Sequence, residues 1–460
     1  MPIAQFSGLA SGIDSGALID AIIEARELRN QIRRDEIEFL ESENESLEEL
    51  NTKLLDLDDL ISKFRTANGN GVAKKSSSTD PAVATASVGS NAYNATYSLD
   101  VSSIADGATG SFNNSYASET AVVSAGSGDV TLTIGTGGDQ VTVSATVTAG
   151  VTNLTQLANA LNADPDAAGR VVASVVNVGT SGSPDYRLLV TTLESGLDMG
   201  TLAMSADAGL TELQTTTIDQ ASDAVFTISG ITGSITRSSN TVEDVISGVT
   251  FNLTDTGSTD IAISNDPDKT ADEISQIVEA FNDIVSFVAE NDTIERVEDD
   301  SDATNVFGSL AKTRLDNDFL AAFRTNLLSA SSSGTSITSM SQLGLSTNRD
   351  GTITFDADDF KEAVDEDPEG VTGVLNNFAD SVSGVSGTIF QYTRFSGFID
   401  VAQESNNDQI ENLSDAIANL ERQTDKQRRT LELRFANLEK ITGDLQSQQQ
   451  ALSGILAGLG

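Results

Sequence analysis

A seven-residue repeat of apolar side chains near the C-terminal end restricts the fold of this 460-residue chain more than any other feature. One heptad position holds Ile410, Ile417, Leu431, Leu438, Leu445 and Leu452, with Thr424 as the single polar occupant. The position three residues later holds Leu413, Leu420 and Ile441, with Gln427, Arg434 and Gln448 as polar interruptions. Two apolar positions in each heptad are typical of a coiled coil, whose seam must be covered by another helix. The segment from Phe398 to about Gly454 is therefore predicted to form a long helix that needs a partner.

A shorter repeat of the same kind lies near the N-terminal end. No Pro or Gly occurs from Leu18 to Thr66, and the apolar seam of this segment comprises Leu40, Leu47, Leu54 and Ile61. The two terminal segments also differ in charge, because residues 35–59 contain 11 acids and one Lys whereas residues 422–440 contain six basic residues and three acids. If the chain folds back so that its ends meet, these stretches would lie side by side and their opposite charges would favour an antiparallel register.

Between the helical ends, from Val72 to about Asp268, the sequence consists of short alternating runs rich in Ser, Thr, Gly and Val. Alternating apolar and polar residues separated by Gly, Asn and Asp are typical of antiparallel β-structure. One helix is predicted within this region at residues 153–162. After Lys269 the helical spacing returns, first in an apolar stripe from Ile274 to Val288 and then in an amphipathic stretch over residues 305–328.

These patterns predict an α+β multidomain fold, in which terminal helices form a coiled-coil leg and a helical domain, and antiparallel β-rich head domains are inserted between them. We expect the leg at residues 1–40 and 401–460, and the helical domain at residues 41–70 and 269–400. A first β-rich domain is expected at residues 71–110 and 223–268. A second β-rich head domain is expected at residues 111–222, inserted into the first.

The composition excludes most kinds of chemistry. Asp and Glu number 69 against 26 Lys and Arg, which gives a formal net charge of −43, and His, Cys and Trp are absent. Without His or Cys the chain has no Ser-His-Asp triad, zinc finger, haem ligand or iron–sulfur ligand. The acidic balance repels nucleic acid, and no stretch approaches the roughly 18 apolar residues of a membrane span. We therefore expect no catalytic, cofactor-binding or metal-binding residue.

Two acidic motifs have a structural interpretation that we prefer to a chemical one. Residues 348–356 resemble part of a calcium loop, but with Gly351 at the sixth loop position the first Asp and the final Glu are missing. We interpret Asp350-Gly351 as a hairpin turn between short strands, followed by a helix. Paired carboxylates such as Asp164 and Asp166 could serve a glycosidase, but such pairs are expected by chance among 69 acids.

The first fourteen residues combine small and apolar side chains. Gly8 and Gly12 precede the first helix, and Asp14 or Ser15 can cap its free amides. A capped helix behind a loose arm accounts for the pattern, although Phe6, Leu9 and Ile13 would then need a partner surface to bury them. We therefore select Phe6, Gly8, Leu9, Gly12, Ile13 and Asp14 as candidates for insertion into a partner.

An ordered set of motifs resembles the bacterial flagellar filament-capping proteins, also called hook-associated protein 2. The matching segments are Phe6–Asp14 with Leu18–Glu24, Ile231–Asn240 with Val245–Thr250, Phe281–Val285, and Leu343–Leu345 with Asn348–Asp356. The C-terminal coiled coil matches in place and character. The resemblance spans nearly the whole chain and leaves only about residues 111–222 without a matching motif.

This resemblance implies a secreted protein at the distal tip of the flagellar filament. Its partners would be further copies of itself in a small ring, commonly of five subunits, together with flagellin, the flagellar export apparatus and an export chaperone. The paired terminal helices would act as legs in the open filament end, and the β-rich domains would cover the flagellin that folds and inserts beneath them. Export through the flagellar channel agrees with a start that lacks the basic and apolar regions of a secretory signal.

Two other functions stay open from the sequence. One is another axial or junction protein of the flagellum, which would share the helical ends. The other is a surface adhesin that acts through its acidic β-rich head. An enzyme is the least favoured interpretation.

Overall fold

We describe the protein from a computed structural model, which places residues 14–68, 71–299, 302–333 and 336–457. The chain divides into two compact units, Met1–Asn68 with Ala271–Gly460 (the helical unit) and Gly69–Thr270 (the β-rich unit). Long terminal helices with antiparallel sheets between them in the sequence confirm the predicted α+β fold class. None of the helices in the described ranges is both long and apolar enough to cross a membrane.

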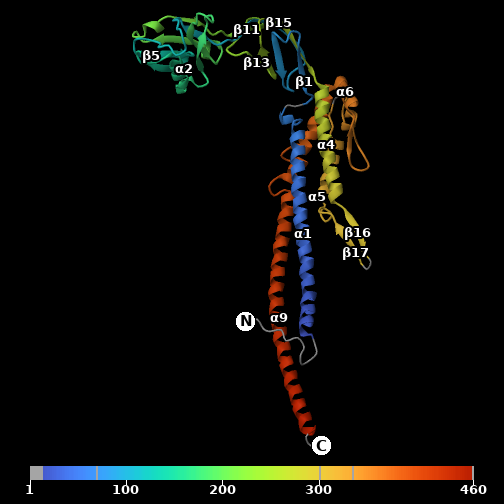
Figure 1. Ribbon diagram of the computed structural model, residues 1–460. Coiled ribbons are helices and arrows are strands. Elements are labelled where there is room, and N and C mark those ends of the chain that lie inside the picture. The colour runs from blue at the N-terminus through green and yellow to red at the C-terminus, as the bar shows by residue number, and fades with distance from the viewer. Residues whose placement is uncertain (1–13, 69–70, 300–301, 334–335, 458–460) are drawn as a thin grey trace. The chain divides into compact units, whose positions relative to one another are not determined.

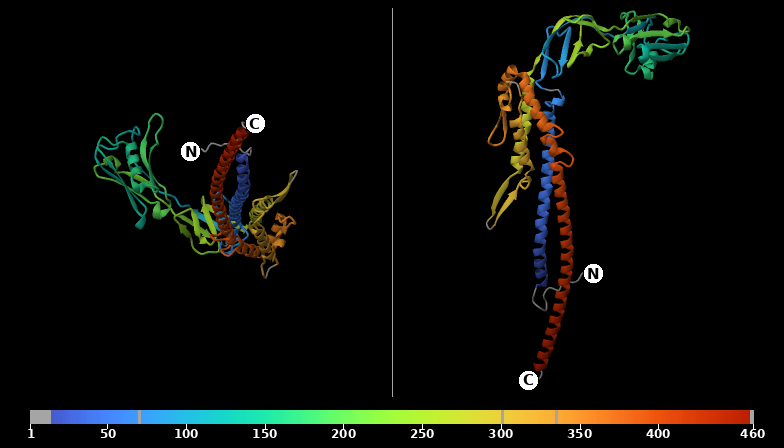
Figure 2. Two further views of the ribbon diagram at one scale, coloured as in Figure 1. Left: turned by 90° about the horizontal axis from the view of Figure 1, so that it is seen from below. Right: turned by 180° about the vertical axis from the view of Figure 1, so that it is seen from behind.

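The helical unit joins the two ends of the chain. In Figures 1 and 2, α1 and α9 run side by side along most of α1. The helices are α1 (Ser15–Ser62), α4 (Pro267–Asn291), α5 (Leu315–Ser329), α6 (Ala357–Glu366), α7 (Pro368–Ser383), α8 (Thr388–Thr393) and α9 (Phe398–Ala457), with short 3-10 turns at Thr66–Asn68 and Met340–Leu343.

Aromatic side chains connect the helices of this unit in one continuous series. Phe281 of α4 stacks on Phe323 of α5 with ring centroids 4.4 Å apart, and Phe323 meets Phe378 of α7 edge-on at 5.5 Å. Farther along, Tyr392 of α8 contacts Phe319 at 5.4 Å and Phe398, the first residue of α9, at 5.0 Å. Because such ring pairs stabilise beyond the area they bury, this series fixes α8 and the start of α9 against the domain core.

Two hairpins complete the helical unit, and one of them was predicted. Strands β18 (Leu345–Thr347) and β19 (Ile353–Phe355) pair around the expected turn, where Gly351 has a φ of 89°. Asp356 then caps α6, since its Oδ1 accepts hydrogen bonds from the amides of Asp358 at 3.0 Å and Asp359 at 3.2 Å. The acids of residues 348–356 thus belong to a turn and a helix cap.

The second hairpin corrects a prediction. Strands β16 (Ile294–Asp299) and β17 (Asp302–Phe307) pair antiparallel, with Ile294 opposite Phe307, and the next helix begins only at Leu315. The expected amphipathic helix over residues 305–328 was therefore wrong in its first ten residues. Val306 and Phe307 precede the later apolar residues at intervals that also fit one face of a helix, but both residues lie in β17.

The β-rich unit contains two hydrophobic cores with no residue in common. The first includes Leu99, Val101, Phe226, Phe251 and Ile261. Its five-stranded sheet has the order β1 (Lys74–Ser78), β15 (Gly257–Asn265), β3 (Ala95–Ser103), β11 (Ala224–Ile228) and β12 (Ile235–Arg237). A three-stranded sheet has the order β13 (Thr241–Ile246), β14 (Val249–Leu253) and β2 (Ala84–Val88).

The second core draws on residues between Ala108 and Ala221. One sheet has the order β10 (Thr216–Asp219), β4 (Thr109–Phe112), β8 (Tyr186–Thr192) and β7 (Val171–Asn177), and the other β6 (Val141–Val147), β5 (Gly128–Ile134) and β9 (Leu202–Ala206). A four-residue helix, α3 (Gly196–Met199), precedes β9. Strand pairs in the described residues are antiparallel throughout.

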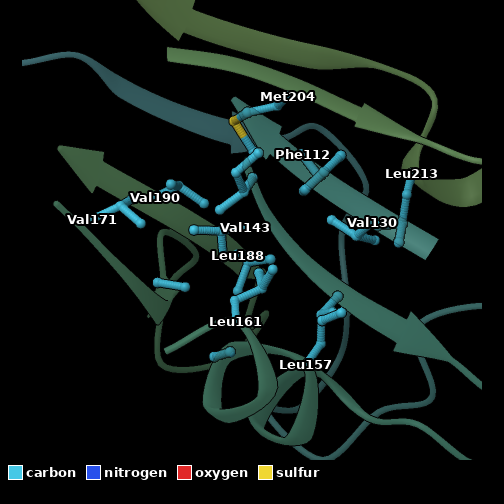
Figure 3. Packing of buried hydrophobic residues seen from close by; sticks show 14 of the residues in the cluster. Phe112, Val130, Val143, Leu157, Leu161, Val171, Leu188, Val190, Met204 and Leu213 are labelled. Atoms are coloured by element: carbon cyan, nitrogen blue, oxygen red, sulfur yellow. The ribbon is translucent and has the colours of Figure 1, made fainter. Parts of the chain in front are cut away.

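The helix predicted at residues 153–162 covers this second core as α2 (Leu154–Ala163). Asn153 and Gln156 form a reciprocal capping box at its start. Figure 3 shows Leu157 and Leu161 of α2 directed toward Val143 and Leu188 of the sheets. A one-sided apolar helix of this kind is stable because it covers a sheet face.

Asp316, in the first turn of α5, places a carboxyl group in the interior of the helical unit. The residue is fully buried, and among the described residues neither of its carboxyl oxygens has a hydrogen-bond partner. Burial, with a smaller contribution from the nearby carboxylates of Asp292 and Asp318, raises the pKa of Asp316 to about 6. The charged form therefore destabilises the folded unit at neutral pH.

We predict that Asp316→Asn stabilises the helical unit at pH 7.5 by about 2–3 kcal/mol, because a pKa raised from 3.8 to about 6 corresponds to that free energy. The folded carboxyl binds its proton below pH 6, whereas the unfolded one does so only near pH 4, so the native protein gains stability as the pH falls through 6. Urea unfolding of both proteins at pH 4.5 and 7.5 tests this. The exposed Asp365→Asn in α6, whose charge is not among those that shift Asp316, is the control, and an equal gain of the Asp316 variant at both pH values would contradict the prediction.

Candidate assembly surface

The candidate assembly surface begins at the first residues of α1. Asp14 caps this helix, since its Oδ1 accepts a hydrogen bond from the amide of Ala17 at 3.0 Å. The remaining candidates of the N-terminal arm, Phe6, Gly8, Leu9, Gly12 and Ile13, lie outside the described residues.

Three amides of α9 hold α1 at Asn44. The Nδ2 of Asn406 donates to Asn44 Oδ1 at 3.0 Å, and Gln403 Nε2 donates to the Asn44 carbonyl oxygen, also at 3.0 Å. Asn44 Nδ2 in turn donates to Asn407 Oδ1 at 3.1 Å. Polar residues at a helix seam specify register because any shift leaves their hydrogen bonds unmade.

Two ion pairs show the direction of the pairing. Arg34 Nη2 lies 2.8 Å from Glu421 Oε1, and Arg428 Nη2 lies 2.9 Å from Asp20 Oδ1. Residue numbers therefore fall along α1 as they rise along α9. The two helices are antiparallel, as the hypothesis of a folded-back chain expected.

The charge argument for the register was wrong. Because Asn44 lies opposite residues 403–407, the acidic stretch 35–59 faces the start of α9 and not the basic stretch 422–440. That basic stretch lies along the first turns of α1, where Arg428 meets Asp20. Exposed ion pairs are individually too weak to set a register against the part-buried hydrogen bonds of Asn44 and apolar packing.

A buried carboxyl adds to the contacts near Asn44. Glu43 is buried, and burial raises its pKa, while its hydrogen bond to Asn406 and the charge of Lys312 act in the opposite direction. Lys312 itself lies 3.0 Å from Glu36 Oε2 and 3.7 Å from the centre of the Phe39 ring. Residues from three segments of the helical unit thus converge at this point of the helix pair.

The seam residues of α1 are all buried, but they do not all face α9. Leu40, Leu47, Leu54 and Ile61 are at most 5% exposed. Since α9 begins at Phe398 and residues 403–407 face Asn44, the last turns of α1 run past its start and contact α7 and α8 instead. At this end Thr66 Oγ1 donates to Asp380 Oδ2 of α7 at 2.6 Å. Leu54 and Ile61 therefore lie in the part of α1 beside these helices.

The seam of α9 changes from buried to exposed along its length. Ile417 and Thr424 are buried, and Ile410, Leu413, Leu420 and Leu431 are half-buried. Leu438, Ile441, Leu445 and Leu452, which we call the C-terminal stripe, are 47%, 60%, 59% and 62% exposed. Figures 1 and 2 show why, since α9 continues well beyond the first residue of α1.

The part of α9 that carries this stripe is also nearly uncharged. Between Ile441 and Ala457 the only ionisable side chain is Asp444, in a chain whose net charge is −43. An apolar row on a neutral helix surface has the character of a seam that a further helix can cover.

Sequence reasoning missed Asn406 and Asn44 as the residues that hold the register. A signal for Asn406 was present, because it lies seven residues before Leu413 and so occupies the same heptad position. Asn44 lies between the seam positions of α1, and only the fold shows its role.

The order of an N-terminal helix, antiparallel sheets and a long C-terminal helix matches the fold of a solved flagellar cap protein. The sequence matches two family models. The model of the N-terminal region of flagellar hook-associated protein 2 matches residues 11–108, and the model of its C-terminal region matches residues 221–447. The chain belongs to the flagellar hook-associated protein 2 family, which consists of structural proteins of the flagellum.

Individual relatives are distant but extend over much of the chain. The A-type flagellar hook-associated protein 2 of Pseudomonas aeruginosa is 25% identical over 98% of this chain and 97% of its own. Flagellar hook-associated protein 2 of Escherichia coli O157:H7 is 24% identical over 80% of this chain and 79% of its own. The crystal structure of the Escherichia coli flagellar cap protein FliD, domains D1-D2-D3, covers 80% of this chain and 99% of its own with a TM-score of 0.58 and 22% identity.

We predict that Asn406→Ala destabilises the helix pair by about 1–3 kcal/mol, because the partners Asn44 and Glu43 lose hydrogen bonds where water has little access. Thermal unfolding followed by circular dichroism measures the effect. The matched control is Asn412→Ala, an exposed residue of the same helix whose side chain bonds only within α9 to the Asp408 carbonyl. Equal unfolding temperatures for the two variants would show that Asn406 does not hold the pair.

Proposed function

We propose that the protein caps the distal end of the flagellar filament and promotes the folding and insertion of exported flagellin, so that it is required for filament elongation and motility. Its partners in this role are flagellin, further copies of the chain, the flagellar export apparatus and an export chaperone. Family membership supports the cap, and the C-terminal stripe supports the contact with flagellin. An absence of Cys suits a chain that passes unfolded through an export channel, because no disulfide has to be broken on the way.

The C-terminal stripe is the observation on which the proposal of filament docking depends. Its four side chains continue the spacing of the α9 seam past the end of the intramolecular pair, so they keep the geometry of a coiled coil while facing water. Because each side chain is only about half exposed, its burial against a partner contributes roughly 1–1.5 kcal/mol. A subunit built of helices supplies such a partner surface, and we assign that role to flagellin at the filament end. The arm residues Phe6, Leu9 and Ile13 are proposed to insert at the same place.

We predict that Ile441→Ser with Leu445→Ser abolishes filament elongation and leaves the fold intact. Both side chains are about 60% exposed, so their replacement removes no internal packing and leaves the unfolding temperature within about 1 °C of the parent. Swimming in soft agar and filament length by electron microscopy, in a strain that carries only the variant, measure the loss. The control is Val151→Ser with Val178→Ser, two residues of the β-rich unit that are 64% and 59% exposed. Normal filaments in the stripe variant would refute docking through this surface.

A strain without the protein tests the cap itself. Flagellin that reaches an uncapped filament end has nothing to hold it during folding, so we expect monomeric flagellin in the culture medium and no long filaments. Quantitative immunoblotting of the medium and of sheared filaments measures both. A strain that lacks the gene but builds filaments of normal length would end the cap proposal.

A further inference from the structure

Two similar turns flank the short helix α8 in the helical unit. In the first, Gly387 donates its amide hydrogen to the Gly384 carbonyl oxygen at 2.6 Å, and in the second Gly397 donates to the Arg394 carbonyl oxygen at 2.7 Å. Each turn presents an apolar side chain at its second position, Val385 at 78% exposure and Phe395 at 91%. We call residues 394–397 the Phe395 turn.

The backbone of the Phe395 turn is held in one conformation. Ser396 has a φ of 55°, a value that side chains other than Gly rarely adopt, and its amide donates to Asp400 Oδ2 at 2.7 Å. A Cβ on Gly397 would lie within 2.6–2.8 Å of three carbonyl oxygens, so only Gly fits there. The phenyl ring of Phe395 gains almost no burial in the monomer, and strained backbone of this kind is concentrated at functional sites.

The Phe395 turn has one basic and one acidic neighbour. The acid is Asp400, which accepts the hydrogen bond from the Ser396 amide. Arg394 stands beside Phe395 and is exposed. Aromatic and Arg side chains together are the residue types enriched in the central contacts of protein interfaces.

A surface of matching character is present elsewhere in the same unit. The base of the β16–β17 hairpin exposes Ile294 at 61%, Val306 at 53% and Phe307 at 40%. Its sequence from Ile294 to Phe307 contains five acids and one Arg. The hairpin sequence thus combines apolar side chains with an excess of acids, although Lys312 Nζ lies 5.7 Å from the centre of the Phe307 ring. The Phe395 turn combines an exposed ring with the cation of Arg394.

The Phe395 turn and the β16–β17 hairpin of the same chain cannot contact each other, because they lie on different sides of the helical unit. In Figure 1 the connection between α8 and α9 lies on one side of α1 and the hairpin on the other. Two complementary surfaces on different sides of one subunit produce a head-to-tail contact, which repeats from copy to copy and closes into a ring when the rotation allows.

We propose that the Phe395 turn of one copy docks on the β16–β17 hairpin of the next copy and so forms the contact between neighbouring subunits of the cap. Phe395 packs against Val306 and Phe307, and Arg394 faces Glu295. This inference rests on the self-assembly in the proposed function, and it adds the surfaces that carry it.

Disulfide crosslinking between two single-cysteine variants tests the contact, since the chain has no Cys of its own. Phe395→Cys and Val306→Cys are mixed and oxidised at a concentration at which the parent protein is oligomeric. We expect a crosslinked dimer in the mixture and none with either variant alone. Tyr93→Cys, at a residue that is 82% exposed in the β-rich unit, replaces one partner as the control and gives no crosslink.

A charge exchange gives a second, independent readout. In Arg394→Glu the new carboxylate faces Glu295 of the neighbouring copy. We therefore expect this variant to reach half-assembly at a protein concentration about tenfold higher than the parent, measured by light scattering. Adding Glu295→Lys to that variant restores assembly, whereas a loss of surface charge without this contact would not be rescued. Parent oligomers without the mixed crosslink, or a crosslink in Phe395→Cys alone, would overturn the proposed contact and leave the cap function standing. A parent protein that stays monomeric at every concentration would overturn both.

Discussion

The antiparallel pairing of α1 with α9 is the contact on which the helical unit depends. Neither helix can bury its apolar seam alone, and more than 300 residues of sequence separate the end of α1 from the start of α9. Hydrogen bonds of Asn44 with Gln403, Asn406 and Asn407 give this pairing a single register. Because α1 pairs with α9, all segments between them in the sequence form an insertion into the helix pair. Changes in the sheets therefore need not disturb the pairing of the two ends.

Register also decides which surface is left for partners. Because Asn44 faces residues 403–407, the last turns of α1 pack against α7 and α8, and the opposite end of α9 passes the first residue of α1. The exposure of Leu438, Ile441, Leu445 and Leu452 follows from this offset rather than from any feature of those residues. A helix pair in the charge-matched register would have a different overhang, so the polar contacts at one end of the pair control the surface at the other.

Local patterns in the sequence predicted the elements, and long-range packing determined what the sequence did not predict. Heptads, alternation and the Asp350-Gly351 turn led to the correct fold class, to α2 and to the β18–β19 hairpin. They did not lead to the register, because summed charge says nothing about which single amide meets another. The same patterns wrongly assigned Val306 and Phe307 to a helix, because two residues at a strand end fit both the helical and the strand spacing of apolar residues. Burial of Asp316 and exposure of Phe395 depend on neighbours from other elements, which no local pattern contains.

The net charge of −43 gives these surfaces a common property. An acidic surface repels other copies of the same chain and other acidic proteins, so a contact is least costly where acids are missing. The α9 segment from Ile441 to Ala457 contains one acid, and the segment between Asp380 and Asp400 contains none. Each carries the exposed apolar side chains that an interface core requires, the C-terminal stripe and Phe395. Their chemistry differs, because one is a neutral row of Leu and Ile and the other is an Arg–Phe turn, so the two places are suited to different partners, as the proposed contacts with the filament and with a neighbouring subunit require.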